Sequence, residues 1–148
     1  MDWGDARIGV AACDPAGMLA YPYDTIPAGS GELTAILRLV DEVAPLEVIV
    51  GLPRSLSGGD GPAALKSRDR ALRLARALQG LGAAVEVRLV DERLTTVSAS
   101  RQLRESGRRA KDQRSVIDAA AAETILEHAL AAERAQGVPP GELVSAGS

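Results

Sequence analysis

The sequence predicts an α/β fold built as a single domain. Short apolar runs rich in β-branched residues alternate along the chain with longer segments whose apolar residues recur every three or four positions. A length of 148 residues suits one core that covers a central sheet. The apolar run 85–90 ends in Asp91 and Glu92, which places charge at the strand edge where open α/β sheets bind ligands.

The first part of the chain indicates an antiparallel hairpin. Residues 8–13 and 19–26 have the composition of strands, and the turn-forming residues 14–17 connect them. Pro22 lies within the second run and favours an edge or irregular position.

A helix and another strand are predicted next. Apolar residues recur at helical spacing over 33–43, with Ser30 as the expected N-cap and Pro45 ending the helix. Residues 47–51 are predicted to be a buried strand. The glycine-rich loop up to residue 61 could hold phosphate oxygens, although it lacks the Walker sequence and a flexible connection is the favoured interpretation.

The second long helix is expected to open at Pro62 and to end at Gly80. Its basic residues are explained by a solvated surface, or alternatively by a strip that faces phosphate. The residues expected on its inner face are Leu65, Leu72, Ala75 and Leu78.

Two helices are expected after the strand 85–90, one short over 97–106 and one starting near Ser115. Proline, glycine and serine dominate from Gly137 onward. We therefore expect one domain over residues 1–135 and a disordered C-terminal tail over 136–148.

Acidic residues stand at several predicted strand and helix ends. Asp2 precedes a tight connection at Gly4, and Asp118 lies in the first turn of the last helix on a stripe with Ala122, Ile125 and Ala129. Because alanine lets a helix approach a sheet closely, Asp118 could reach a strand edge. Simpler roles for these acids are a solvated strand end and a favourable charge at a helix start.

The strongest concentration of basic residues spans 101–114 in an otherwise acidic chain of net charge −3. A basic loop beside a group of carboxylates suits a nuclease, because the cations hold the polyanion while metals held by the acids attack it. A mobile, solvated loop is the alternative. The basic residues are Arg101, Arg104, Arg108, Arg109, Lys111 and Arg114.

Composition narrows the classes of function. No run of about 18 apolar residues occurs, and no signal peptide pattern opens the chain, so we expect a cytoplasmic protein without a membrane partner. The single cysteine, Cys13, excludes an intrachain disulfide and a cysteine-rich zinc site; a small buried residue is favoured over a reactive or intermolecular thiol. The aromatic residues are too few for recognition by base stacking.

Four motifs in order resemble the YqgF (RuvX) family over roughly residues 2–132. They are Asp2-x-Gly4 with Arg7-Ile8-Gly9-Val10-Ala11, Val50-Gly51-Leu52-Pro53 with Gly58 and Gly61, Asp91-Glu92-Arg93-Leu94-Thr95-Thr96, and Ile117-Asp118 with Ala120-Ala121. The resemblance implies an RNase H-like fold with a five-stranded mixed sheet flanked by helices. It also implies a nuclease that matures the 5′ end of the small-subunit ribosomal RNA precursor, with Holliday junction resolution as the competing activity.

The resemblance maps a catalytic acidic triad onto Asp2, Glu92 and Asp118. These acids would hold one or two Mg²⁺ or Mn²⁺ ions, with Asp91 as the alternative to Glu92 because strand parity does not decide between them. We expect the partner to be nucleic acid, either precursor rRNA or branched DNA, and the protein to be a monomer or homodimer. The residues predicted to bind nucleic acid are Arg7, Arg93, Arg108, Arg109 and Lys111.

Two positions depart from the family pattern. Ala6 stands where the family usually has a lysine, so a phosphate contact is expected to be lost. The family's first strand normally begins several residues before the acid, whereas one residue precedes Asp2, so we expect a truncated first strand and a longer full-length protein.

Two other classes of function share features of this sequence. A non-catalytic nucleic-acid-binding module could use the same fold. An actin-like kinase or ATPase also starts with Asp-x-Gly, but it needs two such domains and a second phosphate loop, for which 148 residues are too few.

Overall fold

The computed structural model describes residues 1–54, 59–92 and 111–146, with 111–117 described as backbone only. Within these ranges the chain forms six strands and three helices. The elements are β1 (Asp2–Trp3), β2 (Arg7–Cys13), β3 (Ala20–Pro27), α1 (Glu32–Val43), β4 (Glu47–Leu52), α2 (Pro62–Gly80), β5 (Glu86–Asp91), α4 (Lys111–Gln136) and β6 (Glu142–Val144).

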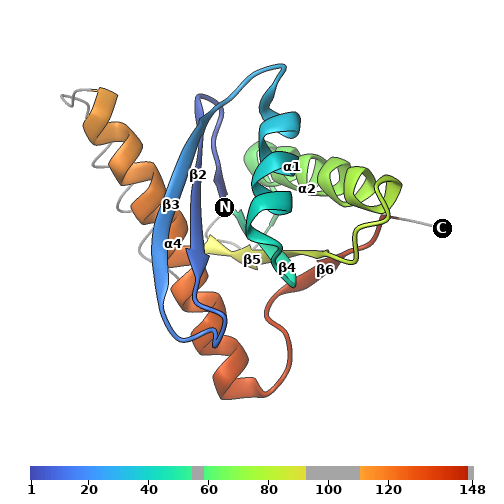
Figure 1. The fold of residues 1–148 in the computed structure, drawn as a ribbon. Helices are drawn as coiled ribbons and strands as arrows, with labels where there is room; N and C mark the ends of the chain where they lie inside the picture. Colours follow the sequence, from blue (N-terminus) through green and yellow to red (C-terminus); the bar gives the residue numbers. More distant parts are fainter. Residues whose placement is uncertain (55–58, 93–110, 147–148) are drawn as a thin grey trace.

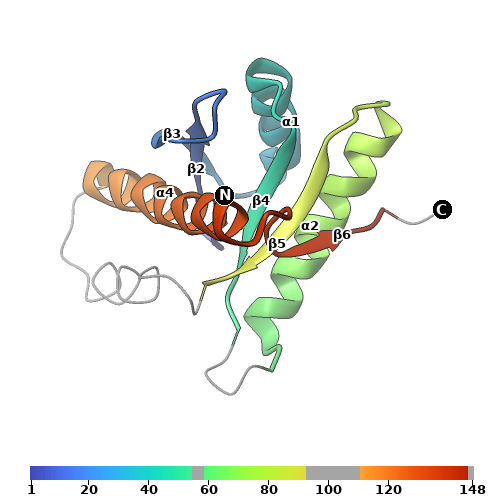
Figure 2. The same cartoon turned by 90° about the horizontal axis from the view of Figure 1, so that it is seen from below.

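The strands are covered by helices on both faces, as predicted for an α/β fold. Figures 1 and 2 show α1 and α2 on one side of the strands and α4 on the other. The strands form two three-stranded sheets, in the orders β1-β2-β3 and β4-β5-β6.

The predicted hairpin is confirmed. Strands β2 and β3 pair antiparallel from Arg7 with Pro27 to Cys13 with Ala20. Their register shifts between Val10 and Ala11, and Ala11 is the residue paired with Pro22. Since β3 is also the outer strand of its sheet, the proline lies at an irregular position on an edge, where it interrupts few ladder bonds.

The two sheets meet at Met1. The Met1 amino group donates a hydrogen bond to the Ile49 carbonyl at 2.5 Å, and the Gly51 N–H donates to the Met1 carbonyl at 3.0 Å. Strand β1 contains only two residues; it lies against β4, but in the described part of the chain the two form no strand ladder. In place of the expected five-stranded sheet, the described residues form two three-stranded sheets, and Met1 makes the backbone hydrogen bonds between them.

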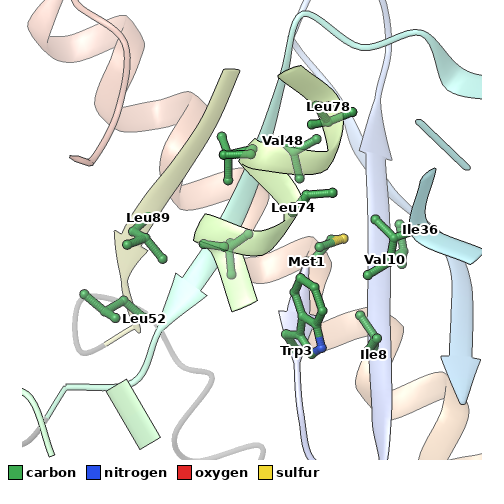
Figure 3. Packing of buried hydrophobic residues seen from close by; sticks show 14 of the residues in the cluster. Met1, Trp3, Ile8, Val10, Ile36, Val48, Leu52, Leu74, Leu78 and Leu89 are labelled. Atoms are coloured by element: carbon green, nitrogen blue, oxygen red, sulfur yellow. The ribbon is translucent and has the colours of Figure 1, made fainter. Parts of the chain in front are cut away.

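The larger core lies between the strands and the helices α1 and α2 (Figure 3). Ile8, Ile36, Leu74 and Leu78 are almost completely buried there. Each such aliphatic side chain contributes about 1.5–3 kcal/mol through burial of apolar surface. The inner face of α2 differs from the prediction, because Leu65 is 58% exposed. The buried residues of α2 are Ala64, Ser67, Ala71, Leu74, Ala75 and Leu78.

A smaller core lies under α4. Ile49 of β4 and Val90 of β5 contact the helix residues Ala121, Ile125 and Ala129. Neighbouring strand residues such as Val50 and Leu89 belong to the larger core instead, since side chains alternate between the faces of a strand. This alternation determines which acids face α4.

Three predicted element boundaries were wrong. Gly31, and not Ser30, is the N-cap of α1, and it makes no side-chain capping bond. Helix α4 begins at Lys111, before the predicted Ser115. The tail expected to be disordered over 136–148 contains β6, which pairs antiparallel with β5 and so gains backbone hydrogen bonds that composition alone does not reveal. The predicted helix over 97–106 lies outside the described residues.

Candidate active site

Three carboxylates are buried on the side of the strands that faces α4. In the part of the chain that the structure describes, the buried polar or charged residues are Asp2, Ser67, Glu92 and Asp118. Asp2, Glu92 and Asp118 are 3%, 2% and 4% exposed. Burial of ionised groups is costly, so buried acids are expected to be paired with a cation or to bind a metal ion.

Gly9 brings Asp118 next to the strand that carries Asp2. Asp2 of β1 is paired with Gly9 of β2, so both residues face the same side. A Cβ atom added to Gly9 would lie 2.0 Å from the Asp118 carbonyl oxygen. Helix α4 can therefore cross β2 this closely only because residue 9 has no side chain.

Gly51 allows the Glu92 side chain to lie directly against β4, because it has no side chain of its own. A Cβ atom at Gly51 would lie 2.4 Å from the Glu92 Oε1 atom and 2.7 Å from the Ile125 Cδ1 atom. The Gly51 N–H also bonds to Met1, the neighbour of Asp2. A continuous set of contacts thus connects the three acids through Gly9, Met1 and Gly51.

Of the adjacent acids, Glu92 and not Asp91 faces α4. Val90 contacts the α4 core. Glu92 directly follows β5, and its Oε1 atom lies beside Gly51 on the side where Ile125 of α4 packs. Asp91 turns the other way, and its carboxylate lies 4.0 Å from the Arg54 guanidinium. The geometry therefore groups Glu92 with Asp2 and Asp118.

Arg7 is bonded directly to one of the acids. Its Nε atom donates to Asp118 Oδ2 at 2.5 Å, and the two side chains are 27% and 6% exposed. Arg7 begins β2, so this bond connects the start of the hairpin with α4. A charge-assisted bond of this kind offsets part of the cost of burying the carboxylate.

The pKa of the Met1 amino group is influenced by Asp2 and Glu92. Burial lowers its pKa to about 6, while the negative charges of Asp2 and Glu92 act in the opposite direction. Both carboxylates therefore lie close enough to Met1 to influence it, which agrees with their position at the junction of the sheets.

A second group of charges lies on the side of α2. Lys66 and Arg70 both donate to Asp5 Oδ1 at 3.0 Å, and these bonds hold the pKa of Asp5 below its usual value. The Arg70 guanidinium also donates to the Trp3 carbonyl and lies 5.9 Å from the centre of the Trp3 ring. These cations connect α2 to β1 at the edge from which Asp2 projects.

The chemistry of the three acids suits a hard divalent cation. Carboxylate oxygens are the ligands that Mg²⁺ and Mn²⁺ prefer. Among residues 1–54, 59–92 and 118–146, however, no three acidic, histidine or cysteine side chains are grouped closely enough to hold one ion. The described arrangement instead pairs Asp118 with a guanidinium.

Comparison with known proteins assigns the family. A family model described as "RuvX: Holliday junction resolvase" matches residues 1–132. The chain belongs to the RuvX family. The match begins before Asp2 and extends beyond Asp118, so it includes all three buried acids and both glycines.

Curated relatives agree with this assignment. The chain is 56% identical to a protein of Nocardioides sp. over 97% of this chain and 93% of the relative. It is 54% identical to a protein of Streptomyces avermitilis and 52% identical to one of Thermobifida fusca, with at least 96% of this chain and 90% of each relative covered. Each of these proteins is named "Putative pre-16S rRNA nuclease".

Most of the basic residues predicted to bind nucleic acid in this RuvX family member cannot be placed. Arg93, Arg108 and Arg109 lie outside the described residues, and Lys111 is described only as the first backbone position of α4. Arg7 is described, and it contacts Asp118. Within the described ranges, no helix is long and apolar enough to cross a membrane.

The two site glycines were not predicted as site residues in this RuvX family member. Gly9 interrupts a strand between Ile8 and Val10, and Gly51 ends an equally apolar run. A glycine within a buried strand often marks a close approach of another backbone or side chain, which is the signal that could have identified both.

Proposed function

We propose that this chain is a metal-dependent nuclease that processes the 5′ end of precursor 16S ribosomal RNA. The observation that carries the proposal is the burial of Asp2, Glu92 and Asp118 on one face. The names of the curated relatives supply the substrate. The reaction is hydrolysis of a phosphodiester bond, and we place it in the cytoplasm and assign it to a monomer or homodimer.

The three carboxylates are proposed to hold one or two Mg²⁺ or Mn²⁺ ions. When bound, such an ion activates water and stabilises the leaving oxygen of the phosphodiester. Asp2 and Glu92 project from strand ends, and Asp118 is brought to their side by α4, so the oxygen ligands would come from three different elements. Burial of all three side chains keeps bulk water from competing for the ligand positions.

Basic residues are proposed to hold the polyanion beside these acids. Arg93, Arg108, Arg109 and Lys111 follow the Asp91-Glu92 edge in the sequence, and Arg7 lies at Asp118. Each contact to a phosphate releases counterions, so binding should weaken steeply with salt.

Holliday junction resolution is the second candidate, since the matching family is described by that activity. Both activities cleave a phosphodiester bond and would use the same acids. They differ in whether the substrate is a single RNA chain or a four-way DNA junction.

The test is a cleavage assay on end-labelled precursor 16S RNA and on a four-way DNA junction, with Mg²⁺ or Mn²⁺. The variant Asp118→Asn keeps the size of the side chain but loses its charge, and it should lower cleavage at least about a hundredfold, because metal stabilisation of the transition state is worth several kcal/mol. Asp69→Asn is the matched control, since Asp69 lies on the outer surface of α2 and pairs with Arg73 four residues along the same helix.

The preferred substrate decides between the two activities. Metal-dependent cutting of the RNA, lost in Asp118→Asn and kept in Asp69→Asn, would support the proposal. Cutting of the junction alone would favour resolution. Binding of either substrate without cleavage under any metal condition would contradict a nuclease and favour a binding module.

A further inference from the structure

A large cavity lies between the strands β2 and β4. Its volume is about 560 Å³, and residues 10–13 of β2 and 47–49 of β4 form two of its walls. Packed protein interiors contain few voids larger than a water molecule. A space of this size is typical of a binding site, so an occupant is expected.

The cavity passes through the layer of the strands. Ile36 and Val40 of α1 line it on one face, and Leu126 and Leu130 of α4 line it on the other. These two helices cover opposite faces of the strands (Figures 1 and 2). A pocket between a helix and a sheet would be lined from one face only. Successive side chains of a strand point to opposite faces, so a further strand placed here would fill the space on both.

Strand β2 extends beyond its partner β1. The pairing of the two strands ends at Asp2, which lies opposite Gly9, whereas β2 continues to Cys13. Because the strands are antiparallel, chain joined ahead of Met1 in the same register would lie opposite residues 11–13, which line the cavity. In the part of the chain that the structure describes, no other strand pairs with this edge of β2.

Strand β4 presents a matching edge to the cavity. The Ile49 carbonyl accepts from the Met1 amino group, and the Gly51 N–H donates to the Met1 carbonyl, which is the bonding pattern of two parallel strands. The N–H and C=O of one strand residue point to the same side, so the Ile49 N–H also points to this edge. The next bonds of the ladder would join the Ile49 N–H and the Glu47 carbonyl to a residue two positions ahead of Met1.

The Met1 amino group lies where such a strand would join the chain. Met1 lines the cavity, and Figure 3 shows it between β4 and Val10 of β2. Burial lowers the pKa of its amino group to about 6. A peptide N–H could donate the same bond to Ile49 without a charge to bury, so this position favours an amide nitrogen over an ammonium group.

We propose that the cavity is the binding site of one β-strand, an extended apolar segment joined to the Met1 nitrogen. The segment would lie parallel to β4 and antiparallel to β2, and it would unite the two sheets in the order β3-β2-β1-β4-β5-β6. Met1 belongs to the core under α1 and α2, so the residue two positions ahead of it points to α1 and its two neighbours point to α4. A separate peptide would place its own carboxylate against the Met1 amino group and bury two charges, which favours the joined strand. The inference does not depend on the nuclease proposed above.

The first test extends the chain ahead of Met1 and measures Tm. A Val-Leu-Val extension, released from a cleavable fusion so that no other residue is added, should raise Tm by at least about 5 °C, because it buries apolar side chains and continues both ladders. Val-Pro-Val is the matched control. It also converts the Met1 amino group into an amide, but its proline has no N–H to donate to the Glu47 carbonyl. Equal Tm values of the two extended chains would overturn the proposal.

Amide hydrogen exchange locates the added strand. The Ile49 N–H should exchange at least about tenfold more slowly in the Val-Leu-Val chain than in the Val-Pro-Val chain, since only the first places a strand at this edge. The Val50 N–H points to the β5 side and is the internal control, because it should slow only by the overall gain in stability. Equal slowing of the two amides would also overturn the proposal.

Other occupants give distinct results. Protection of the Ile49 N–H in the unextended chain by free acetyl-Val-Leu-Val, without protection in the extended chain, would assign the cavity to a separate strand. Protection of the same N–H in a dimer of the unextended chain would assign it to a second copy. Either result would overturn the joined strand.

Discussion

At the scale of single residues, the choice between two adjacent acids shows what a sequence can and cannot determine. A buried strand ending in Asp91 and Glu92 predicts a charged edge, but either residue could face the ligand. The answer depends on which face of the strand lies under a helix. Val90 contacts α4, and this contact assigns Glu92 to the α4 side.

This assignment leads to a paired test. Glu92→Gln should lower metal-dependent cleavage at least about a hundredfold, since it removes a buried anionic ligand. Asp91→Asn should stay within about threefold of the unmodified protein, because its partner is Arg54 on the other side. Cleavage rates under single-turnover conditions would check both. A larger loss in Asp91→Asn than in Glu92→Gln would reassign the ligand.

Arg7 could be predicted as a basic residue of the site but not as a partner of Asp118. Its bond spans 111 residues and depends on where α4 crosses β2. The spacing of apolar and polar residues along the sequence does not predict where α4 crosses β2. The residue type was therefore predictable, whereas its bond to Asp118 was not.

At the scale of elements, the approach of α4 to the strands was anticipated from its alanine stripe. Asp118, Ala122, Ile125 and Ala129 are all buried, as the helical spacing predicts. The short distance between α4 and the strands was not anticipated, because it depends on Gly9 of β2 and Gly51 of β4. A stripe of small residues on a helix allows a close approach only if the strand residues opposite it are also small.

Substitution of Gly9 should therefore act through α4. Gly9→Ala should lower the free energy of unfolding by at least about 2 kcal/mol, because the new methyl group overlaps the Asp118 carbonyl and the backbone must shift. Gly80→Ala is the matched control. Gly80 ends α2 with no atom within 4 Å of an added Cβ, so this change should be neutral or stabilise by up to about 1 kcal/mol. Urea denaturation measures both, and equal stability of the two variants would contradict the close approach.

At the scale of the whole molecule, the alternation of apolar periods was sufficient to predict an α/β fold and its hairpin. It was not sufficient to predict how the strands are grouped. The two sheets are joined by backbone bonds of Met1, and no hydrophobic pattern reports a contact made by one residue. Strand β6 was missed for a similar reason, since three residues among glycine and proline carry almost no periodic signal.

Strand β6 should contribute measurably to the stability of the whole domain. It pairs with β5 from Val87 to Leu89, and Glu142 also bonds to Arg68 of α2. Deletion of residues 137–148 should lower Tm by a few degrees and increase aggregation, because the β5 edge becomes available to other chains. Deletion of residues 147–148 alone is the control and should leave Tm unchanged. Unaltered Tm and solubility in the longer deletion would show that β6 is dispensable.

The close approach at Gly9 and Gly51 also affects how a saturation mutagenesis survey of this protein should be interpreted. Substitutions at both glycines should impair the protein as strongly as substitutions of the acids, although a glycine has no side chain that could contact a substrate. The glycine variants and the acid variants would differ in the yield of soluble protein. Variants at the glycines should reduce the amount of soluble protein recovered, whereas variants at the acids should be recovered in full and fail in turnover. Expression level and specific activity, recorded together for every variant, would therefore separate the residues that make room for the site from those that belong to it.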